Sequence, residues 1–126
     1  MFASYDVSLE VVRHLREVVP AIKKYDADLA DQLRRAASSV VLNLGEGARR
    51  TAGNQRLHYE IAFGSANEVK ACLDVAERWG WFCPSQELRD LIDRQLRLLW
   101  GLTEGRRRRA GESAPSTAQG GGRASP

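Results

Sequence analysis

Residue types that commonly carry out chemistry are few in this sequence, and their spacing matches no familiar catalytic or metal site. The two histidines, His14 and His58, are far apart, and neither follows a glutamate by three residues, as the inward-facing pairs of a di-metal bundle do. Cys72 and Cys83 lack the second cysteine pair or spaced histidines of a zinc site. The sequence contains no catalytic triad, phosphate-binding glycine loop or dinucleotide-binding motif. We therefore expect no catalytic residue, no cofactor and no metal.

Polar side chains interrupt the apolar faces of two segments whose hydrophobic pattern is helical. At about 100° per residue, Ser39 and Asn43 fall beside the apolar positions of the earlier of these two segments, which lies between residues 28 and 49. Ser65 and Glu68 fall on or beside those of the second, so we expect Glu68 to point toward the core. Because a buried polar group without a partner costs about 1–3 kcal/mol, these groups should pair, within the chain or between subunits. The predicted structural network consists of Gln32, Arg34, Arg35, Ser39, Asn43, Glu46, Ser65 and Glu68.

Positive charge is unevenly distributed along the chain. Residues 1–105 contain 14 Lys and Arg against 15 Asp and Glu, whereas residues 106–126 contain 5 against 1. If successive helices alternate in direction, the arginines after the second helix meet the run at the end of the fourth, and such clusters bind phosphates. The alternative is a solvated end, because arginines favour helix C-termini for electrostatic reasons alone. The candidate RNA-binding residues are Arg49, Arg50, Arg56, Arg106, Arg107, Arg108 and Arg109.

The elements that must position these residues follow from the apolar spacing and its breaks. The chain has 126 residues, of which 43% are hydrophobic, enough for one domain with a core. Breaks at 23–28, 49–54 and 80–85 separate four segments with helical spacing, and no segment alternates as a strand does. Short loops between four helices predict an all-α fold, an up-down-up-down antiparallel four-helix bundle over residues 1–109. Residues 110–126, rich in Gly, Ser and Pro, are predicted to be a disordered tail.

Two finer expectations concern single helices. Pro20 interrupts the first helical pattern and predicts a kink, or a helix end just before it. In the third segment, the apolar stripe expected to face the core contains Leu57, Ile61, Gly64, Cys72, Val75 and Trp79. The aromatic residues that follow this segment should gather at the end opposite the arginines, where they would close the core or form a subunit contact.

The sequence gives no indication of export or of a membrane. No run approaches the roughly 18–20 consecutive apolar residues of a membrane span, and the first residues have neither a basic nor an apolar targeting region. We expect a cytoplasmic protein that has no membrane partner and whose two cysteines are reduced.

Three motifs occur in order across the central helices, and together they resemble a known family. They are Gln32-x-Arg34-Arg35-Ala36-Ala37-x-Ser39, Asn43-x-x-Glu46-Gly47-x-x-Arg50 and Gly64-Ser65-x-x-Glu68. The chain resembles the bacterial four-helix-bundle proteins encoded in 23S rRNA intervening sequences, to which the accessory variability determinant of diversity-generating retroelements is similar. The resemblance implies a homopentamer shaped like a short barrel and no enzymatic activity. In the retroelement branch it further implies binding to RNA and to a reverse transcriptase.

The sequence thus favours a non-enzymatic, homopentameric four-helix-bundle protein that acts as an RNA-associated accessory or scaffold factor. The alternative is a protein–protein interaction scaffold that does not bind nucleic acid. An RNA-processing enzyme of an unknown type is a third and weaker interpretation.

Overall fold

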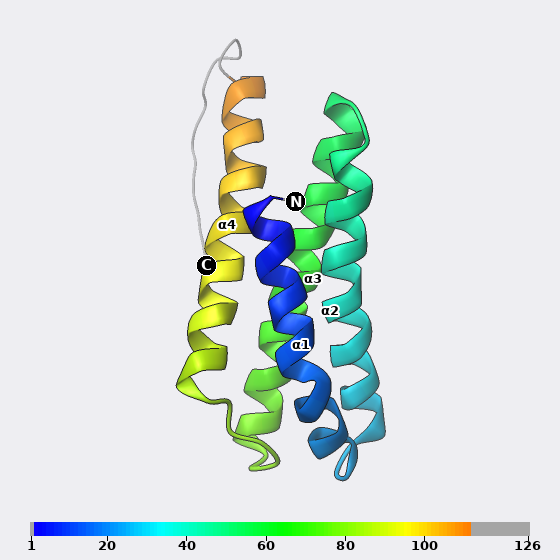
Figure 1. The fold of residues 1–126 in the computed structure, drawn as a ribbon, viewed down its shortest axis with the longest axis vertical. Helices are drawn as coiled ribbons and strands as arrows, with labels where there is room; N and C mark the ends of the chain where they lie inside the picture. The colour runs from blue at the N-terminus through cyan, green and yellow to red at the C-terminus, as the bar shows by residue number, and fades with distance from the viewer. Residues whose placement is uncertain (1, 112–126) are drawn as a thin grey trace.

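The computed structural model describes the backbone of residues 2–111 and the side chains of residues 2–104. Within this part of the chain all regular structure is helical, as predicted (Figure 1). The helices are α1 (Ala3–Lys23), α2 (Ala27–Ala48), α3 (Ala52–Arg78) and α4 (Gln86–Gly111). Residues 112–126, which make up most of the predicted tail, lie outside the described part.

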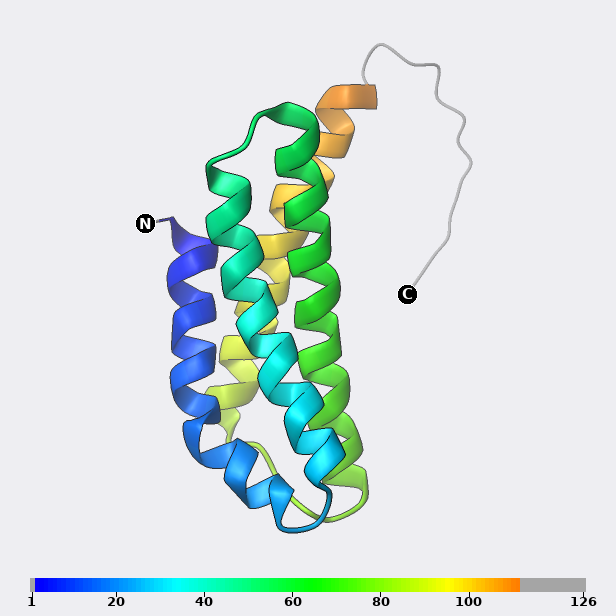
Figure 2. The ribbon, with the colours of Figure 1, turned by 90° about the vertical axis from the view of Figure 1, so that its right-hand side faces the viewer.

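The four helices pack in the order in which they occur along the chain. α2 packs against α1 and α3, and α4 packs against α3 and α1, so that each helix has two neighbours. The three connections lie at alternating ends of the molecule, with the α2–α3 connection at one end and the other two opposite (Figures 1 and 2). Each helix therefore leaves an outward face that no other element of the described chain covers.

The helix boundaries follow from local chemistry. Asp26 precedes α2, and its side chain accepts a hydrogen bond of 2.9 Å from the Leu29 backbone N–H, which satisfies one free donor of the first turn. Ser85 does the same for α4 through the Leu88 N–H at 3.1 Å. After α3, Gly80 has a φ of 80°, a left-handed conformation that glycine adopts without a side-chain clash. All three residues lie within the breaks at 23–28 and 80–85 that the sequence predicted.

Of the two outcomes expected at Pro20, the kink is confirmed and the helix end is wrong. α1 continues through this residue to Lys23, and Figure 2 shows that its last turns bend toward the start of α2. Pro20 is exposed, whereas Val18 and Ile22 on either side of it are buried. The apolar contacts of these two residues hold the last turns on the bundle, so the missing N–H bends the helix instead of ending it.

Three of the seven buried positions of α3 are alanines, and the predicted core stripe of this helix is largely wrong. Leu57, Ile61, Val75 and Trp79 are 53%, 42%, 43% and 68% exposed, and of the expected stripe Cys72 is buried. The buried positions are Tyr59, Ala62, Ala66, Val69, Cys72, Leu73 and Ala76. The helix is therefore rotated relative to the expectation, because alanines on its inner side let its backbone approach its neighbours closely.

Candidate functional site

A chain of partly buried hydrogen bonds joins α2 to α3. The Ser39 and Ser65 hydroxyl groups lie 2.8 Å apart, and the Asn43 side-chain amide donates to the Ser39 carbonyl at 2.9 Å and to its hydroxyl at 3.1 Å. The Asn43 carbonyl oxygen is 2.9 Å from Nδ1 of His58. Because that oxygen can only accept, the hydrogen bond is donated by Nδ1 of His58. Ser39, Asn43 and Ser65 were predicted to pair, whereas His58 was not expected among them.

The other predicted members of this network lie elsewhere. Arg34 and Arg35 are exposed and pair with Asp31 on their own helix, at 2.7 Å and 3.3 Å. Gln32 and Glu68 are also exposed, so the expectation that Glu68 points toward the core is wrong for the single chain. The rotation of α3 is the physical reason, because it brings Ala66 and Val69 inward and turns Glu68 outward.

Glu46 lies at the end of α2 and binds arginines instead of the network. It forms ion pairs with Arg50 and, at 3.9 Å, with Arg49. The hydrogen bond from Arg50 and its charge hold the pKa of Glu46 below its ordinary value, with a smaller contribution from Arg49. Two of the predicted RNA-binding arginines thus already have an anionic neighbour.

Gly47, which follows Glu46, allows α2 and α3 to approach each other closely. A Cβ atom built on Gly47 would lie 2.7 Å from a ring carbon of Tyr59 and 3.1 Å from Cβ of His58. The Gly47 carbonyl in turn accepts a 3.0 Å hydrogen bond from the Gln55 side chain. This contact fixes the position of the turn that carries Arg49 and Arg50.

The arginine-rich end of the bundle contains the α2–α3 connection and the last turns of α4 (Figure 2). Arg49 and Arg50 have side chains 78% and 51% exposed, and Arg56 is exposed on the first turns of α3. The run Arg106–Arg109 falls within the helical span of α4, although its side chains lie outside the described residues. The backbone therefore brings the two groups of predicted arginines to one end of the molecule.

A line of uncovered side chains runs along α3, and we call it the α3 outer stripe: Leu57, Ile61, Glu68, Val75 and Trp79. Spacings of four and seven residues place these positions on one side of the helix. Large apolar side chains that are exposed in a row differ from single exposed apolar residues, which are common on protein surfaces. The sequence showed this row as an apolar stripe, but the pattern alone assigned it to the core.

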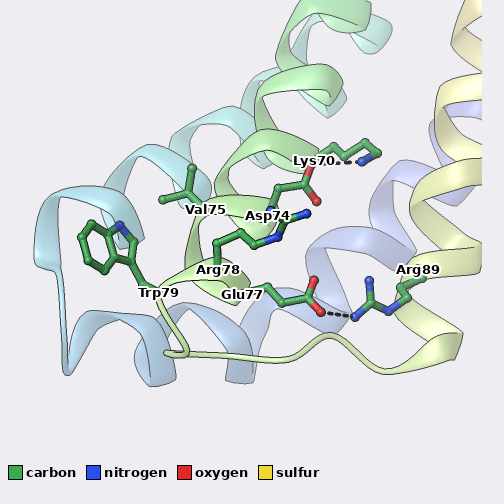
Figure 3. Close-up of a pocket in the computed structure, with 7 residues that line it drawn as sticks. All are labelled: Lys70, Asp74, Val75, Glu77, Arg78, Trp79 and Arg89. Carbon is green, nitrogen blue, oxygen red and sulfur yellow. Dashed lines mark hydrogen bonds and ion pairs between the residues drawn. The ribbon is translucent and has the colours of Figure 1, made fainter.

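The opposite end of the bundle carries aromatic side chains and paired charges. The ring of Trp81 stacks between Tyr25 and Trp79, with centroids 5.8 Å and 5.6 Å away. Beside Trp79 lies an open hollow in which Lys70 pairs with Asp74 at 3.0 Å and Arg89 with Glu77 at 2.7 Å (Figure 3). Most charges of this hollow therefore already have partners within the chain.

The described part of the chain contains no metal-binding cluster, and one of its two cysteine thiols is buried. No group of three or more His, Cys, Asp or Glu side chains comes together there. Burial raises the pKa of the Cys72 thiol to about 11, which keeps it protonated at neutral pH. None of the described helices is long and apolar enough to cross a membrane.

Fold and surface together define a small all-α bundle protein whose most unusual described feature is an uncovered apolar stripe. Its sequence matches the model of the 23S rRNA-intervening sequence protein family over residues 3–101, and the chain belongs to this family. No curated protein matches it.

A similar solved structure is that of a protein of unknown function from the S23 ribosomal protein family of Bacteroides thetaiotaomicron. It is 18% identical, the match covers 81% of this chain and 99% of that one, and the TM-score is 0.74. At this identity the similarity concerns the fold.

Proposed function

We propose that this protein is a non-enzymatic bundle that assembles as a homopentamer and acts as an RNA-associated accessory or scaffold factor. The observation that carries the proposal is the convergence at one end of the bundle of Arg49, Arg50 and Arg56 with the helical segment that contains Arg106–Arg109. Arginine guanidinium groups bind phosphates through paired hydrogen bonds, and assembly in a closed ring would repeat this end around one rim. The family description refers to an intervening sequence of 23S rRNA, and RNA is therefore the polyanion to test first.

Assembly is supported by the α3 outer stripe. Four of its five residues are large apolar side chains at least 42% exposed in the single chain. Covering them with another chain would remove apolar surface from water, which favours association by about 25 cal/mol per Å² before the costs of binding are subtracted.

A salt series of RNA binding tests this proposal. Filter binding with a single-stranded and a structured RNA would be measured for the wild type and for a variant in which Arg106–Arg109 are replaced by Gln. Each phosphate contact contributes about −0.7 to the slope of log K against log salt on a single strand, so four contacts give a difference of up to about 3. We expect weaker binding and a flatter slope for the variant, with similar losses for different RNA sequences.

A matched control neutralises positive charge at the other end of the bundle, with Lys23, Lys24 and Arg78 replaced by Gln. This variant should bind RNA as the wild type does. Equal losses in both variants would indicate a diffuse electrostatic attraction and overturn the assignment to the arginine-rich end. No binding by the wild type would instead favour the alternative function, a scaffold for proteins alone.

A further inference from the structure

We infer that the α3 outer stripe of one copy binds the groove between α1 and α2 of the next copy, with Glu68 placed between Arg16 and Arg34 of that neighbour. The inference rests on the proposed homopentamer and assigns the two surfaces that would form it. Three observations carry it: the shape and chemistry of the groove, its level along the bundle, and the angle between the two faces.

An odd-numbered ring sets the first requirement. A face that binds its own copy on a second chain produces pairs, whereas a ring of five needs two different and complementary faces on each chain. The α3 outer stripe is one such face, because its apolar side chains project from the bundle. The second face must be a recess of apolar character.

The groove between α1 and α2 meets that requirement. It has a volume of about 270 Å³, and its floor is formed by apolar side chains of α1, among them Val12, Leu15 and Val19. Arg16 of α1 and Arg34 of α2 also line it. The hollow beside Trp79 is less suitable, because Lys70, Asp74, Glu77 and Arg89 form two ion pairs there, and the two apolar residues that line it, Val75 and Trp79, belong to the α3 outer stripe itself.

Charge complementarity connects the two faces. Glu68 is exposed in the middle of the α3 outer stripe, seven residues from both Ile61 and Val75. A carboxylate covered by an apolar partner surface would be costly, unless that surface supplies a positive group. Arg16 and Arg34 of the groove supply it, and Arg34 would share its guanidinium between Glu68 and its partly exposed partner Asp31.

The two faces also lie at the same level along the bundle. Ser65 on α3 contacts Ser39 on α2, which sets a common level for the two helices. Glu68 lies about one turn beyond Ser65, and the groove residues Ser38 and Arg34 lie up to about one and a half turns before Ser39. Because α2 and α3 run in opposite directions, both steps lead toward the same end of the bundle (Figure 1). A ring whose axis is parallel to the bundle requires its two faces to share a level in this way.

The angle between the faces fits a small ring. Glu68 is three residues after Ser65 and four before the buried Cys72, so the stripe lies on the α2 side of α3. The groove lies on the other side of α2. Neighbouring sides of a four-helix bundle meet at about a right angle, and faces so related close a ring after about four or five copies.

Charge reversal tests the pairing of the two faces. Glu68→Arg and Arg34→Glu should each raise the apparent dissociation constant of the assembly by about 100-fold or more, because each places like charges in contact. The double variant should recover most of the assembled mass in light scattering. Asp93→Arg, a charge reversal at an exposed position of α4, is the matched control and should assemble normally. Circular dichroism should show unchanged helical content in all variants.

Covalent trapping gives an independent result that does not depend on affinity. With Cys83 replaced by Ser, a Glu68→Cys and Arg34→Cys chain should yield a ladder of covalent oligomers with a short bis-maleimide, which can span the Cβ atoms of an Arg–Glu pair. A disulfide would be too short for this, because it needs Cβ atoms about 3.8 Å apart. Covalent dimers from the Glu68→Cys chain alone would show a like-to-like contact and overturn the inference. Absence of the ladder would do the same.

The two proposals fail in different ways. A wild-type mass of 14.0 kDa in solution, that of the single chain, would overturn the assembly itself, and the inference with it. An assembled wild type whose charge-reversal variants also assemble normally would overturn the assigned faces and leave the proposed function standing.

Discussion

A surface helix is expected to bury its large apolar side chains, but α3 exposes several of them on its outer side and buries alanines on its inner side. On the inner side, Ala62, Ala66 and Ala76 are fully buried, while on the outer side Leu57 and Trp79 are more than half exposed. Small residues on the inner side bring α3 close to its neighbours, so the inner contact depends on the fit of backbones and methyl groups. The larger side chains remain available for a contact outside the chain. The comparison shows that large apolar residues alone do not identify the buried side of a helix, because the side that packs depends on how closely the neighbouring helices approach.

Enlarging an inner-side alanine should produce the largest effect. Ala66→Leu places three more carbon atoms in a fully buried position, and such overpacking should lower the free energy of unfolding by about 3 kcal/mol. Urea unfolding followed by circular dichroism measures it. The control is Gly64→Ala, because a Cβ at Gly64 meets no atom within 4 Å and alanine favours the helix by up to about 1 kcal/mol. Equal stability of Ala66→Leu and wild type would contradict a tightly packed inner side.

A charge on the outer side should affect assembly and leave the fold intact. Leu57→Asp introduces a carboxylate near the N-terminus of α3, where the helix itself tolerates it. We expect the free energy of association to weaken by about 2 kcal/mol, which is roughly a 30-fold higher dissociation constant, with unchanged helicity. Sedimentation over a concentration series measures the mass. Asn67→Asp, an exposed position off the stripe on the same helix, is the control and should assemble as the wild type does.

Removing the hydrogen bonds between α2 and α3 should change the stability of the chain less strongly. Asn43→Leu leaves His58 Nδ1 and the Ser39 hydroxyl without their partner, which should cost about 1 kcal/mol of stability. Glu68→Leu, by contrast, should leave the free energy of unfolding of the single chain within about 0.5 kcal/mol of wild type, because Glu68 is exposed. Thermal unfolding of both variants at low protein concentration gives the comparison. A larger loss for Glu68→Leu than for Asn43→Leu would return Glu68 to the inner side.

The smallest expected effect is a pH dependence at the end of α2. Arg50, and to a lesser degree Arg49, lower the pKa of Glu46 in the folded chain. The stabilisation is therefore present above the unfolded pKa of about 4.3 and is lost as the pH falls through the lower folded value. The melting temperature of wild type should exceed that of Glu46→Gln slightly at pH 7, and the difference should vanish in the acid range. A difference that grows on acidification would contradict the assigned direction.

Local chemistry made the helix ends predictable from the sequence. Asp26, Gly80 and Ser85 each act through backbone groups within a few residues, so their effect does not depend on the rest of the fold. The faces of α3 were not predictable in this way. Two apolar stripes share that helix, an inner one that includes three alanines and an outer one of large residues, and helical spacing does not distinguish them.

The candidate site was predictable in part for the same reason. Asn43, Ser39 and Ser65 lie on facing sides of α2 and α3 and pair as the spacing indicated. Glu68 was assigned inward together with the stripe that surrounds it, and both proved to lie outside. The sequence did not indicate the role of His58, which only follows the apolar position Leu57. Its hydrogen bond joins two helices, and the pattern of one helix does not show such a contact.

The order of the helices around the bundle has a consequence for how the chain folds. Every extensive helix contact except that between α1 and α4 joins consecutive segments. Short sequence separations between contacting residues favour folding on the microsecond to millisecond scale. The α2–α3 hairpin, whose turn is fixed by Gly47 and Tyr59, can form before the chain ends meet, and the buried hydrogen bond from Gln95 to Ser8 can form only after α4 has returned to α1. In an analysis of folding rates, we expect substitutions at Gly47 to slow folding and those at Gln95 mainly to speed unfolding.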